Sequence, residues 1–290
     1  MTAIALCSIK GSPGVTTLAT LLAGSWPRES GRRAIVVEAD PAGGDIAGRF
    51  GLAAGVGWQS VRSAARRAGA SVSLDEHLQR LPGGLDVLVA GRGSDVPTAD
   101  DPVTLPLWST VDDTVNILDL GRVRPGSEVD GWMTACRLTL VVARGSAADL
   151  LHLRAHGEWL RTVTGGSVAA VVVGRTRPLD EVAKFTEIRV LAHVPSDPRA
   201  AAVAGGSGGR TGRLFGSGLL AVACHLASEL DAELAGCADS APPADRSSHG
   251  PSVAAHSPRT TASTAPLRIL APQAWTSGRN GYADDDRSGR

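Results

Sequence analysis

Short apolar runs alternate with longer amphipathic stretches over residues 1–235. The runs are typical of strands buried on both faces and lie at 3–9, 34–39, 85–90, 114–119, 137–143, 168–174 and 188–193. The stretches between them have helix-like spacing and lie at 14–25, 57–68, 74–80, 127–135, 146–163 and 213–234. This alternation predicts an α/β fold, a doubly wound and mostly parallel sheet with helices on both faces. Such sheets bind ligands at the carboxyl ends of their strands, so the residues that follow the runs are the candidates for chemistry.

The pattern changes near Cys237, where periodicity gives way to Ser, Pro, Ala, Thr, Gly and Asp. We therefore predict one ordered domain over residues 1–236 and a disordered Ser/Pro/Ala-rich tail over residues 237–290. One apolar island in the tail, residues 267–270, is open to interpretation as a docking peptide, as a weak membrane-touching segment or as plain linker. Prolines on both sides of the island argue against a long amphipathic membrane helix.

Composition narrows the classes of function. The sequence holds 29 Lys and Arg against 29 Asp and Glu, so there is no global electrostatic case for nucleic acid as a partner. A solvated helix face explains the basic residues of the 57–68 stretch better than a DNA contact does: Arg62, Arg66 and Arg67. The apolar stretch at 214–230 is interrupted by Gly, Ser and His, and it falls short of the ~18 apolar residues of a membrane span. Any membrane association is therefore expected to be peripheral at most.

The cysteines and the amino-terminal residues indicate a reducing compartment. The cysteines show no CxxC pair and no His at ligand spacing, so neither a zinc site nor a disulfide framework is expected; they are Cys7, Cys136, Cys224 and Cys237. Met1 leads straight into the first apolar run, without a signal-like segment. We expect a cytoplasmic protein.

The loop after the first run carries the most specific signal. Residues 10–17, here called the phosphate loop, read Lys-Gly-Ser-Pro-Gly-Val-Thr-Thr between a strand-like and a helix-like run. Such a loop presents backbone N–H groups and a positive helix terminus to phosphates, and Thr16 offers the hydroxyl that a Walker loop gives to Mg²⁺. Val15 stands where the Walker pattern has its lysine. We predict a site that holds a nucleotide but hydrolyses it weakly or not at all; the simpler alternative is a Gly-Pro turn.

Carboxylates follow two further runs. Asp40 comes directly after the run 34–39, in an Asp-Pro turn at the sheet edge where it can orient a water molecule, and Glu38 can assist through water. Asp119 ends an apolar run and precedes Gly121, as the Mg²⁺-positioning acid of a Walker B strand does. The alternative for Asp119 is a cap of the next element.

Residues 194–198, Val-Pro-Ser-Asp-Pro, follow the last of the apolar runs. A rigid turn there is able to lay backbone groups against a purine ring, although by itself the pattern is only a turn.

Taken in order, these motifs resemble the MinD/ParA family of deviant-Walker P-loop ATPases (SIMIBI-type P-loop NTPases) over about residues 1–235. The resemblance is greatest to divergent MinD-like proteins of actinobacteria, similar to the CpaE-type ATPases associated with Tad pilus assembly. It implies ATP and Mg²⁺ as cofactors and a homodimer that sandwiches the nucleotide. It implies catalytic roles for Lys10, which reaches the partner's phosphates, and for Asp40. The implied cofactor-binding residues are Gly11, Ser12, Pro13, Gly14, Val15, Thr16, Thr17, Pro195 and Asp197, and the implied metal-site residues are Thr16, Asp119 and Glu38.

The sequence also departs from the family pattern. Besides Val15, Ser12 replaces a glycine of the loop, and Gly174 stands where many members carry an adenine-reading Asn. The resemblance implies a nucleotide-dependent switch that positions or regulates a larger assembly in pilus assembly or secretion, chromosome partitioning or division. A non-catalytic pseudo-ATPase scaffold that binds an unknown protein partner is the alternative. ATP-dependent reductases of this fold hold an iron–sulfur cluster with two cysteines, and only Cys136 lies near the Walker B region.

Overall fold

The computed structural model describes residues 2–53, 55–68, 72–91, 96–104, 113–207 and 212–238. Of the predicted tail, residues 237–290, the structure describes only Cys237 and Ala238, at the end of a helix, and the rest with its apolar island lies outside the described residues.

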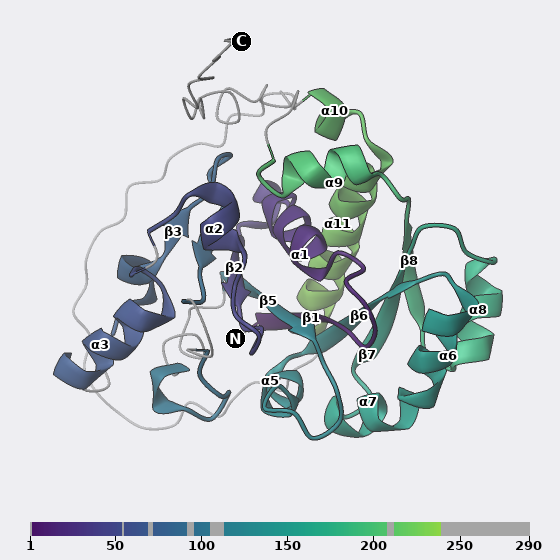
Figure 1. Ribbon diagram of the computed structural model, residues 1–290, viewed down its shortest axis with the longest axis horizontal. Coiled ribbons are helices and arrows are strands. Elements are labelled where there is room, and N and C mark those ends of the chain that lie inside the picture. Colours follow the sequence, from purple (N-terminus) through teal and green to yellow (C-terminus); the bar gives the residue numbers. More distant parts are fainter. Residues whose placement is uncertain are drawn as a thin grey trace, which may run out of the picture.

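An eight-stranded sheet runs through the middle of the molecule (Figure 1). The spatial order is β3-β4-β2-β5-β1-β6-β7-β8, and neighbouring strands are parallel except β3 with β4. The strands span Thr2–Ser8 (β1), Arg33–Glu38 (β2), Gln79–Arg80 (β3), Asp86–Leu88 (β4), Thr114–Arg122 (β5), Leu138–Arg144 (β6), Val168–Val173 (β7) and Val190–Val194 (β8). Because β1 lies between β5 and β6, the phosphate loop opens onto the middle of the carboxyl edge of the sheet.

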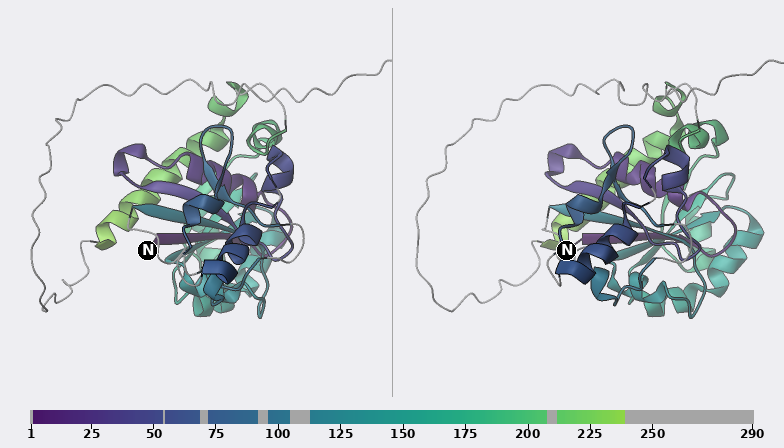
Figure 2. Two further views of the ribbon diagram at one scale, coloured as in Figure 1. Left: turned by 90° about the vertical axis from the view of Figure 1, so that its left-hand side faces the viewer. Right: turned by 60° about the vertical axis from the view of Figure 1, so that its left-hand side comes forward.

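Helices cover both faces of the sheet. One face carries α1 (Val15–Gly24), α2 (Ile46–Phe50), α9 (Pro198–Ala204), α10 (Gly212–Phe215) and α11 (Gly218–Ala238). The other carries α3 (Trp58–Ala68), α5 (Asp130–Ala135), α6 (Ala147–Ala155), α7 (Gly157–Val163) and α8 (Leu179–Thr186). In the side views of Figure 2, the green α11 and the teal helices lie on opposite sides of the sheet. Short 3-10 helices span Arg28–Ser30 (η1), Leu74–His77 (η2) and Pro102–Thr104 (η3). None of the helices in the described ranges is both long and apolar enough to cross a membrane.

The apolar run of one strand contributes side chains to two hydrophobic cores, one on each face of the sheet. Ile4 and Leu6 of β1 pack into the core under α1 and α11, whereas Ala3, Ala5 and Cys7 of the same strand pack into the core on the other face. Successive side chains of a strand point to opposite faces, so a strand that is covered on both sides must be apolar throughout. The predicted fold class, a doubly wound and mostly parallel α/β sheet, is confirmed.

The predicted helix at 74–80 is wrong in its second half. Leu74–His77 form the 3-10 helix η2, and Gln79–Arg80 form β3, the antiparallel edge strand. Gly83 and Gly84 turn the chain back into β4 with φ angles of 100° and 86°. These left-handed glycines make a hairpin where the apolar spacing alone indicated a helix.

Two other predicted helices are each divided in the structure. The stretch 146–163 breaks at His156 into α6 and α7, and the stretch 213–234 breaks at Ser217 into α10 and α11. The Ser217 hydroxyl accepts the N–H of Leu220 at 3.2 Å, so this side chain starts a new helix rather than continuing the old one. The sequence analysis did not predict α2, α8 or α9.

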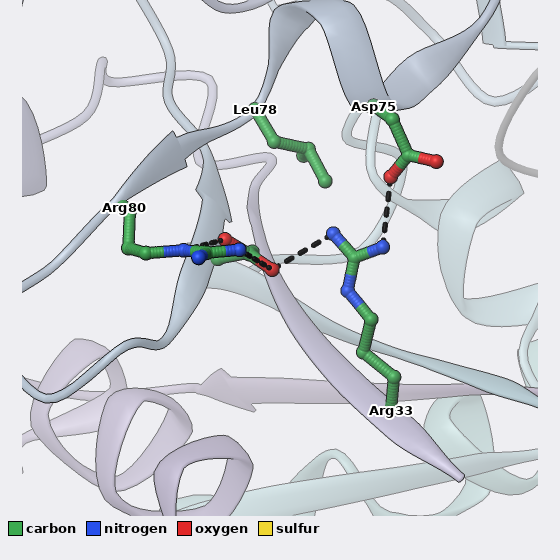
Figure 3. Close-up of a pocket in the computed structure, with 5 residues that line it drawn as sticks. Arg33, Asp75, Leu78 and Arg80 are labelled. Atoms are coloured by element: carbon green, nitrogen blue, oxygen red, sulfur yellow. Dashed lines mark hydrogen bonds and ion pairs between the residues drawn. The ribbon is translucent and has the colours of Figure 1, made fainter.

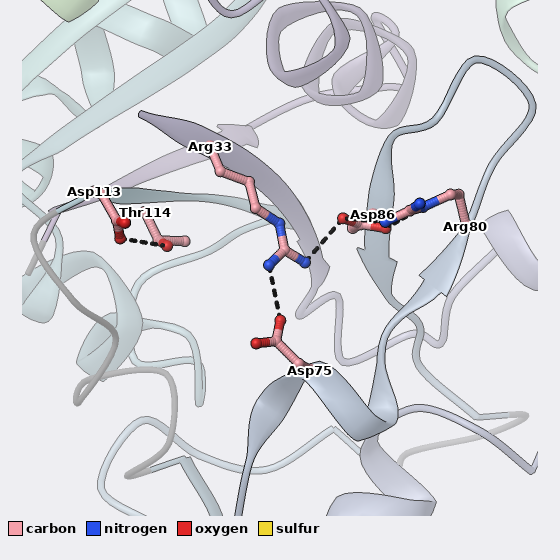
Figure 4. Close-up of polar contacts among 6 residues, drawn as sticks. All are labelled: Arg33, Asp75, Arg80, Asp86, Asp113 and Thr114. Atoms are coloured by element: carbon pink, nitrogen blue, oxygen red, sulfur yellow. Dashed lines mark hydrogen bonds and ion pairs between the residues drawn. The ribbon is translucent and has the colours of Figure 1, made fainter. Parts of the chain in front are cut away.

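An ion-pair network lies at the amino ends of β2 and β4, at the opposite end of the strands from the phosphate loop (Figure 3). The Arg33 guanidinium at the start of β2 lies 2.8 Å from Asp75 and 2.8 Å from Asp86, and Arg80 pairs with the other oxygen of Asp86 at 2.8 Å. Figure 4 shows the same arginine between the two carboxylates from another side. These residues line a hollow of about 550 Å³. Since each charge drawn there has an opposite charge beside it, we interpret the network as a structural clamp between β2, η2 and β4.

Candidate functional site

The backbone of the phosphate loop has the conformation that an anion site needs. Gly11 has a φ of 70°, and Gly14, which precedes α1, has φ 103° and ψ 37°. Side chains other than hydrogen rarely tolerate this left-handed region, so both turns depend on glycine. No side chain caps the amino end of α1 and no acidic residue lies in its first turn. The first N–H groups of α1 are therefore available to donate hydrogen bonds to an anion in the loop.

Val15 does not take part in the loop surface. Its side chain is only 5% exposed and belongs to the core under α1, together with Leu18 and Leu22. Pro13 is buried as well, whereas Ser12 is exposed and Thr16 and Thr17 are half-buried. The position that holds a lysine in the Walker pattern is thus part of the hydrophobic core.

Lys10, at the start of the loop, is exposed. It lines a small hollow together with Asp149 of α6 and residues of β6. Its role across a dimer stays a prediction.

Thr16 and Asp119 lie near each other beneath the loop, and their role as metal ligands stays a prediction. Asp119 lies on β5, pairs in register with Leu6 of β1 and is only 3% exposed. Its carboxylate accepts the N–H of Gly121 at 3.0 Å, and the Thr16 side chain lies close enough to lower the pKa of this carboxylate. Burial raises the pKa of Asp119 to about 6, although Thr16 and the Gly121 N–H act to lower it.

This pair has the donor chemistry of a Mg²⁺ site. A hydroxyl and a carboxylate are hard oxygen ligands, and Mg²⁺ takes one or two such groups from the protein and the remainder from phosphates and water. Among the described residues, Asp119 has no ion-pair partner, so a buried negative charge is left for a cation to neutralise. No group of three or more His, Cys, Asp or Glu in the described part of the chain is arranged to hold a metal ion by itself.

Asp40 lies at the same edge, one strand away from the loop. The pairing of β2 with β5 places Glu38 beside Asp119, and Asp40 follows two residues later. The Oδ1 atom of Asp40 accepts the N–H of Ala42 at 2.8 Å, and its other oxygen lies against Gly121. Partial burial raises the pKa of Asp40, and the nearby Asp45 charge raises it further.

Glu38 has a different environment from the one expected of a metal ligand. It is 2% exposed, and its two carboxylate oxygens accept the N–H groups of Ile46 at 2.8 Å and Ala90 at 2.9 Å. The Trp58 indole donates to its backbone carbonyl at 2.8 Å. Burial raises the pKa of Glu38 to about 7. Through these contacts Glu38 joins the start of α2 to the segment that follows β4, and we call this arrangement the Glu38 clasp. The predicted metal role of Glu38 stays a prediction, and the two backbone contacts do not support it.

The turn at 194–198 lies beside the end of β7, where the Gly174 N–H donates to the Val194 carbonyl at 2.8 Å. The Asp197 carboxylate caps α9 by accepting the N–H of Ala200 at 2.9 Å. Pro195 packs against Gly218, where an added Cβ would lie 2.9 Å from the ring. The adenine-side roles of Pro195 and Asp197 stay predictions.

Two arginines near the site were missed by sequence analysis. Arg144, the last residue of β6, donates from Nη2 to the Ser12 carbonyl at 3.3 Å. Arg49 of α2 pairs with Asp45 at 2.8 Å, and its charge lowers the pKa of Asp119. The signal for Arg144 was present, because it directly follows an apolar run, as Asp40 does.

Comparison with known proteins identifies the fold. No protein-family model matches the sequence, and no curated protein matches it either. A ParA family ATPase from Chlorobium tepidum TLS is 17% identical, with a TM-score of 0.62, over 79% of this chain and 98% of that chain. The septum site-determining protein MinD complexed with Mg-ADP from Pyrococcus horikoshii OT3 is 18% identical, with a TM-score of 0.63, over 81% of this chain and 98% of that chain. A chain of the MinC:MinD cell division protein complex of Aquifex aeolicus is 12% identical, with a TM-score of 0.62, over 85% and 99%. The chain has the fold of the MinD/ParA P-loop ATPases.

Proposed function

We propose that this chain, which has a MinD/ParA-type P-loop fold, is a nucleotide-dependent dimerising switch that positions or regulates a larger assembly. The observation that carries the proposal is the contact between Thr16 and Asp119 beneath an uncapped, glycine-shaped loop. A buried carboxylate without an ion-pair partner is costly, and its place beneath a loop that presents N–H groups supports a role in holding a cation with the bound phosphates.

ATP and Mg²⁺ are the proposed ligands. The backbone of residues 11–17 holds the phosphates, Thr16 and Asp119 hold the metal, and Asp40 orients water at the open side of the site. Bound Mg²⁺ supplies positive charge that neutralises the phosphate oxygens. The MinD structure from Pyrococcus horikoshii is a complex with Mg-ADP, which supports this choice of ligands by analogy of fold.

Hydrolysis is proposed to be weak or absent. Val15 is buried in the core, so the loop lacks the lysine ammonium group that a Walker loop has at this position. Loss of one positioned electrostatic group commonly costs ~2.7–4 kcal/mol of transition-state stabilisation, or about 10²–10³ in rate. The proposed output of the site is therefore the bound state itself rather than turnover.

A dimer and a protein partner complete the proposal. Lys10 is exposed beside the loop, where a second copy facing the nucleotide would meet it. The Aquifex aeolicus MinD chain is in a complex with MinC, which supports a protein partner for this fold. We propose a cytoplasmic homodimer that acts on a pilus or secretion, partitioning or division component, with at most peripheral membrane contact and no general affinity for nucleic acid.

Calorimetric titration of the full chain with ATP and Mg²⁺, and with a non-hydrolysable analogue, tests the proposal. We expect micromolar binding that needs Mg²⁺, accompanied by dimers in analytical ultracentrifugation. Asp119→Asn should remove the Mg²⁺ dependence, whereas Asp113→Asn, an exposed carboxylate before the same strand, should leave it unchanged. A folded protein that binds no nucleotide would refute the switch.

The burial of Val15 in the core keeps a second candidate open, a pseudo-ATPase scaffold. It predicts no ATP-induced dimer and no effect of Asp40→Ala on partner binding. The same titration separates the two, because only the switch requires nucleotide.

A further inference from the structure

The phosphate loop carries no cation of its own between Gly11 and Thr17, but the structure brings one to it from another strand. Arg144 ends β6, which pairs with β1 through contacts such as Cys7 with Val141. The two strands are parallel, so the residue after the β6 run reaches the same edge from which the loop emerges. The position of Arg144 at the loop therefore follows from the topology of the sheet.

The guanidinium of Arg144 lies on the flank of the loop. Its Nη2 atom is 3.3 Å from the Ser12 carbonyl oxygen, and its Nη1 atom would be 3.3 Å from a Cβ placed on Gly11. Gly11 thus serves two purposes: its φ of 70° shapes the turn, and its missing side chain leaves room for the guanidinium.

The charge of Arg144 is not neutralised within the described part of the chain. No carboxylate there lies within ion-pair distance of it, and the contact to Ser12 uses one of its five N–H donors. By contrast, Arg33, Arg49 and Arg80 are each paired with an aspartate. A guanidinium with unused donors, beside an N–H-rich loop, has the chemistry of a bidentate phosphate contact.

We propose that Arg144 is the phosphate-binding cation of this site and takes over, from the same chain, the charge that Val15 has lost. This inference rests on the proposed nucleotide binding and adds a specific residue to it. Arg144 contacts the phosphates from the β6 side of the loop, whereas a lysine at position 15 would approach from the helix. The substitution of charge therefore favours binding of the triphosphate without restoring the geometry of a Walker lysine.

The test compares ATP with adenosine on the full chain by calorimetry, for wild type, Arg144→Ala and Arg144→Lys. A charged hydrogen-bond partner commonly contributes ~1.5–3 kcal/mol, so Arg144→Ala should weaken ATP binding by about tenfold to a hundredfold. Arg144→Lys should recover part of that loss, because lysine restores the positive charge but not the paired N–H donors of the guanidinium. Adenosine binding should not change in either variant.

Arg137→Ala is the matched control, since Arg137 is an exposed arginine at the other end of β6. It should bind ATP as wild type does, and circular dichroism should show all variants folded. Unchanged ATP affinity in Arg144→Ala would overturn the inference while leaving the proposed function intact. An equal loss for ATP and adenosine would also overturn it, because Arg144 would then only shape the loop. Absence of ATP binding in wild type would refute the proposed function and the inference together.

Discussion

The carboxylate of Asp40 lies against the α-carbon of Gly121, so close that a methyl group at position 121 would overlap it. Asp40 follows β2, and Gly121 lies on the neighbouring strand β5, two residues beyond Asp119. Gly121 also has a φ of 59°, which favours glycine independently of the contact. The candidate water-orienting residue is therefore positioned partly by the absence of a side chain on the next strand.

Gly121→Ala should destabilise the fold and displace Asp40. The left-handed backbone alone commonly costs ~1–3 kcal/mol for a residue other than glycine, and the overlap with the carboxylate adds to it. Gly126→Ala is the control, because Gly126 has a φ of 73° with no atom within 4 Å of an added Cβ. Urea denaturation should show the larger loss for Gly121→Ala; equal losses would contradict the contact.

Stability should fall as the pH rises from about 4.5 to about 7 through the titration of Glu38. The pKa of Glu38 is raised from 4.5 to about 7 in the folded protein, so the unfolded chain loses its proton first and gains stability relative to the native state. The slope is at most about 1.4 kcal/mol per pH unit for one group. Asp119, with a pKa of about 6, acts in the same direction.

The difference in unfolding free energy between wild type and Glu38→Gln isolates this group, because the glutamine does not titrate. In urea denaturation at several pH values, the unfolding free energy of wild type should fall relative to that of the variant as the pH increases. Glu29→Gln, which removes an exposed carboxylate instead of a buried one, is the matched control for the substitution itself. A pH-independent difference for Glu38→Gln would contradict the raised pKa.

Lys10→Ala should abolish nucleotide-dependent dimers and leave the monomer folded. Lys10 is exposed, so its loss removes no core contact, and its proposed partner is the phosphate of the second subunit. Lys184→Ala on α8 is the matched control, because these two are the only lysines of the chain. Sedimentation velocity with a non-hydrolysable ATP analogue is the measurement, and dimers that persist in Lys10→Ala would argue against a role across the interface.

Val15→Lys should raise ATP turnover by about 10²–10³, if the missing cation is what limits hydrolysis. The variant should also lose stability, because a side chain that is 5% exposed leaves the core under α1, and burial of a valine contributes ~1.5–3 kcal/mol. Val15→Ala creates the same kind of packing defect without the charge and should leave turnover unchanged. Steady-state turnover of Val15→Lys at the wild-type level would show that another step is limiting.

The sheet was predictable because each central strand is apolar on both faces, a pattern that few other structures require. The edge of the sheet was not: the residues of β3 have no apolar run, and their pairing depends on the turn at Gly83 and Gly84. The break at Ser217 was missed for a similar reason, since the capping hydroxyl of this residue overrides a helical pattern that continues across it. At the break at His156, no side chain caps α7.

At the site, the meeting of Thr16 with Asp119 was predictable, because both follow from which strands end at the same edge. The environment of Glu38 was not, since its partners at Ile46 and Ala90 are backbone groups that no side-chain pattern identifies. Arg144 was overlooked because its sequence distance from the loop hides the pairing of β6 with β1.

The Glu38 clasp has a mechanical consequence. One rigid, two-pronged group fastens two segments that have no other need to move together, the start of α2 behind the Asp40 turn and the end of β4. A displacement of the Asp40 turn must either stretch the bond to Ile46 or pull Glu38 away from Ala90. A rearrangement of the Asp40 turn is thus coupled to the residues that follow β4, the parallel neighbour of β2 at the same edge of the sheet.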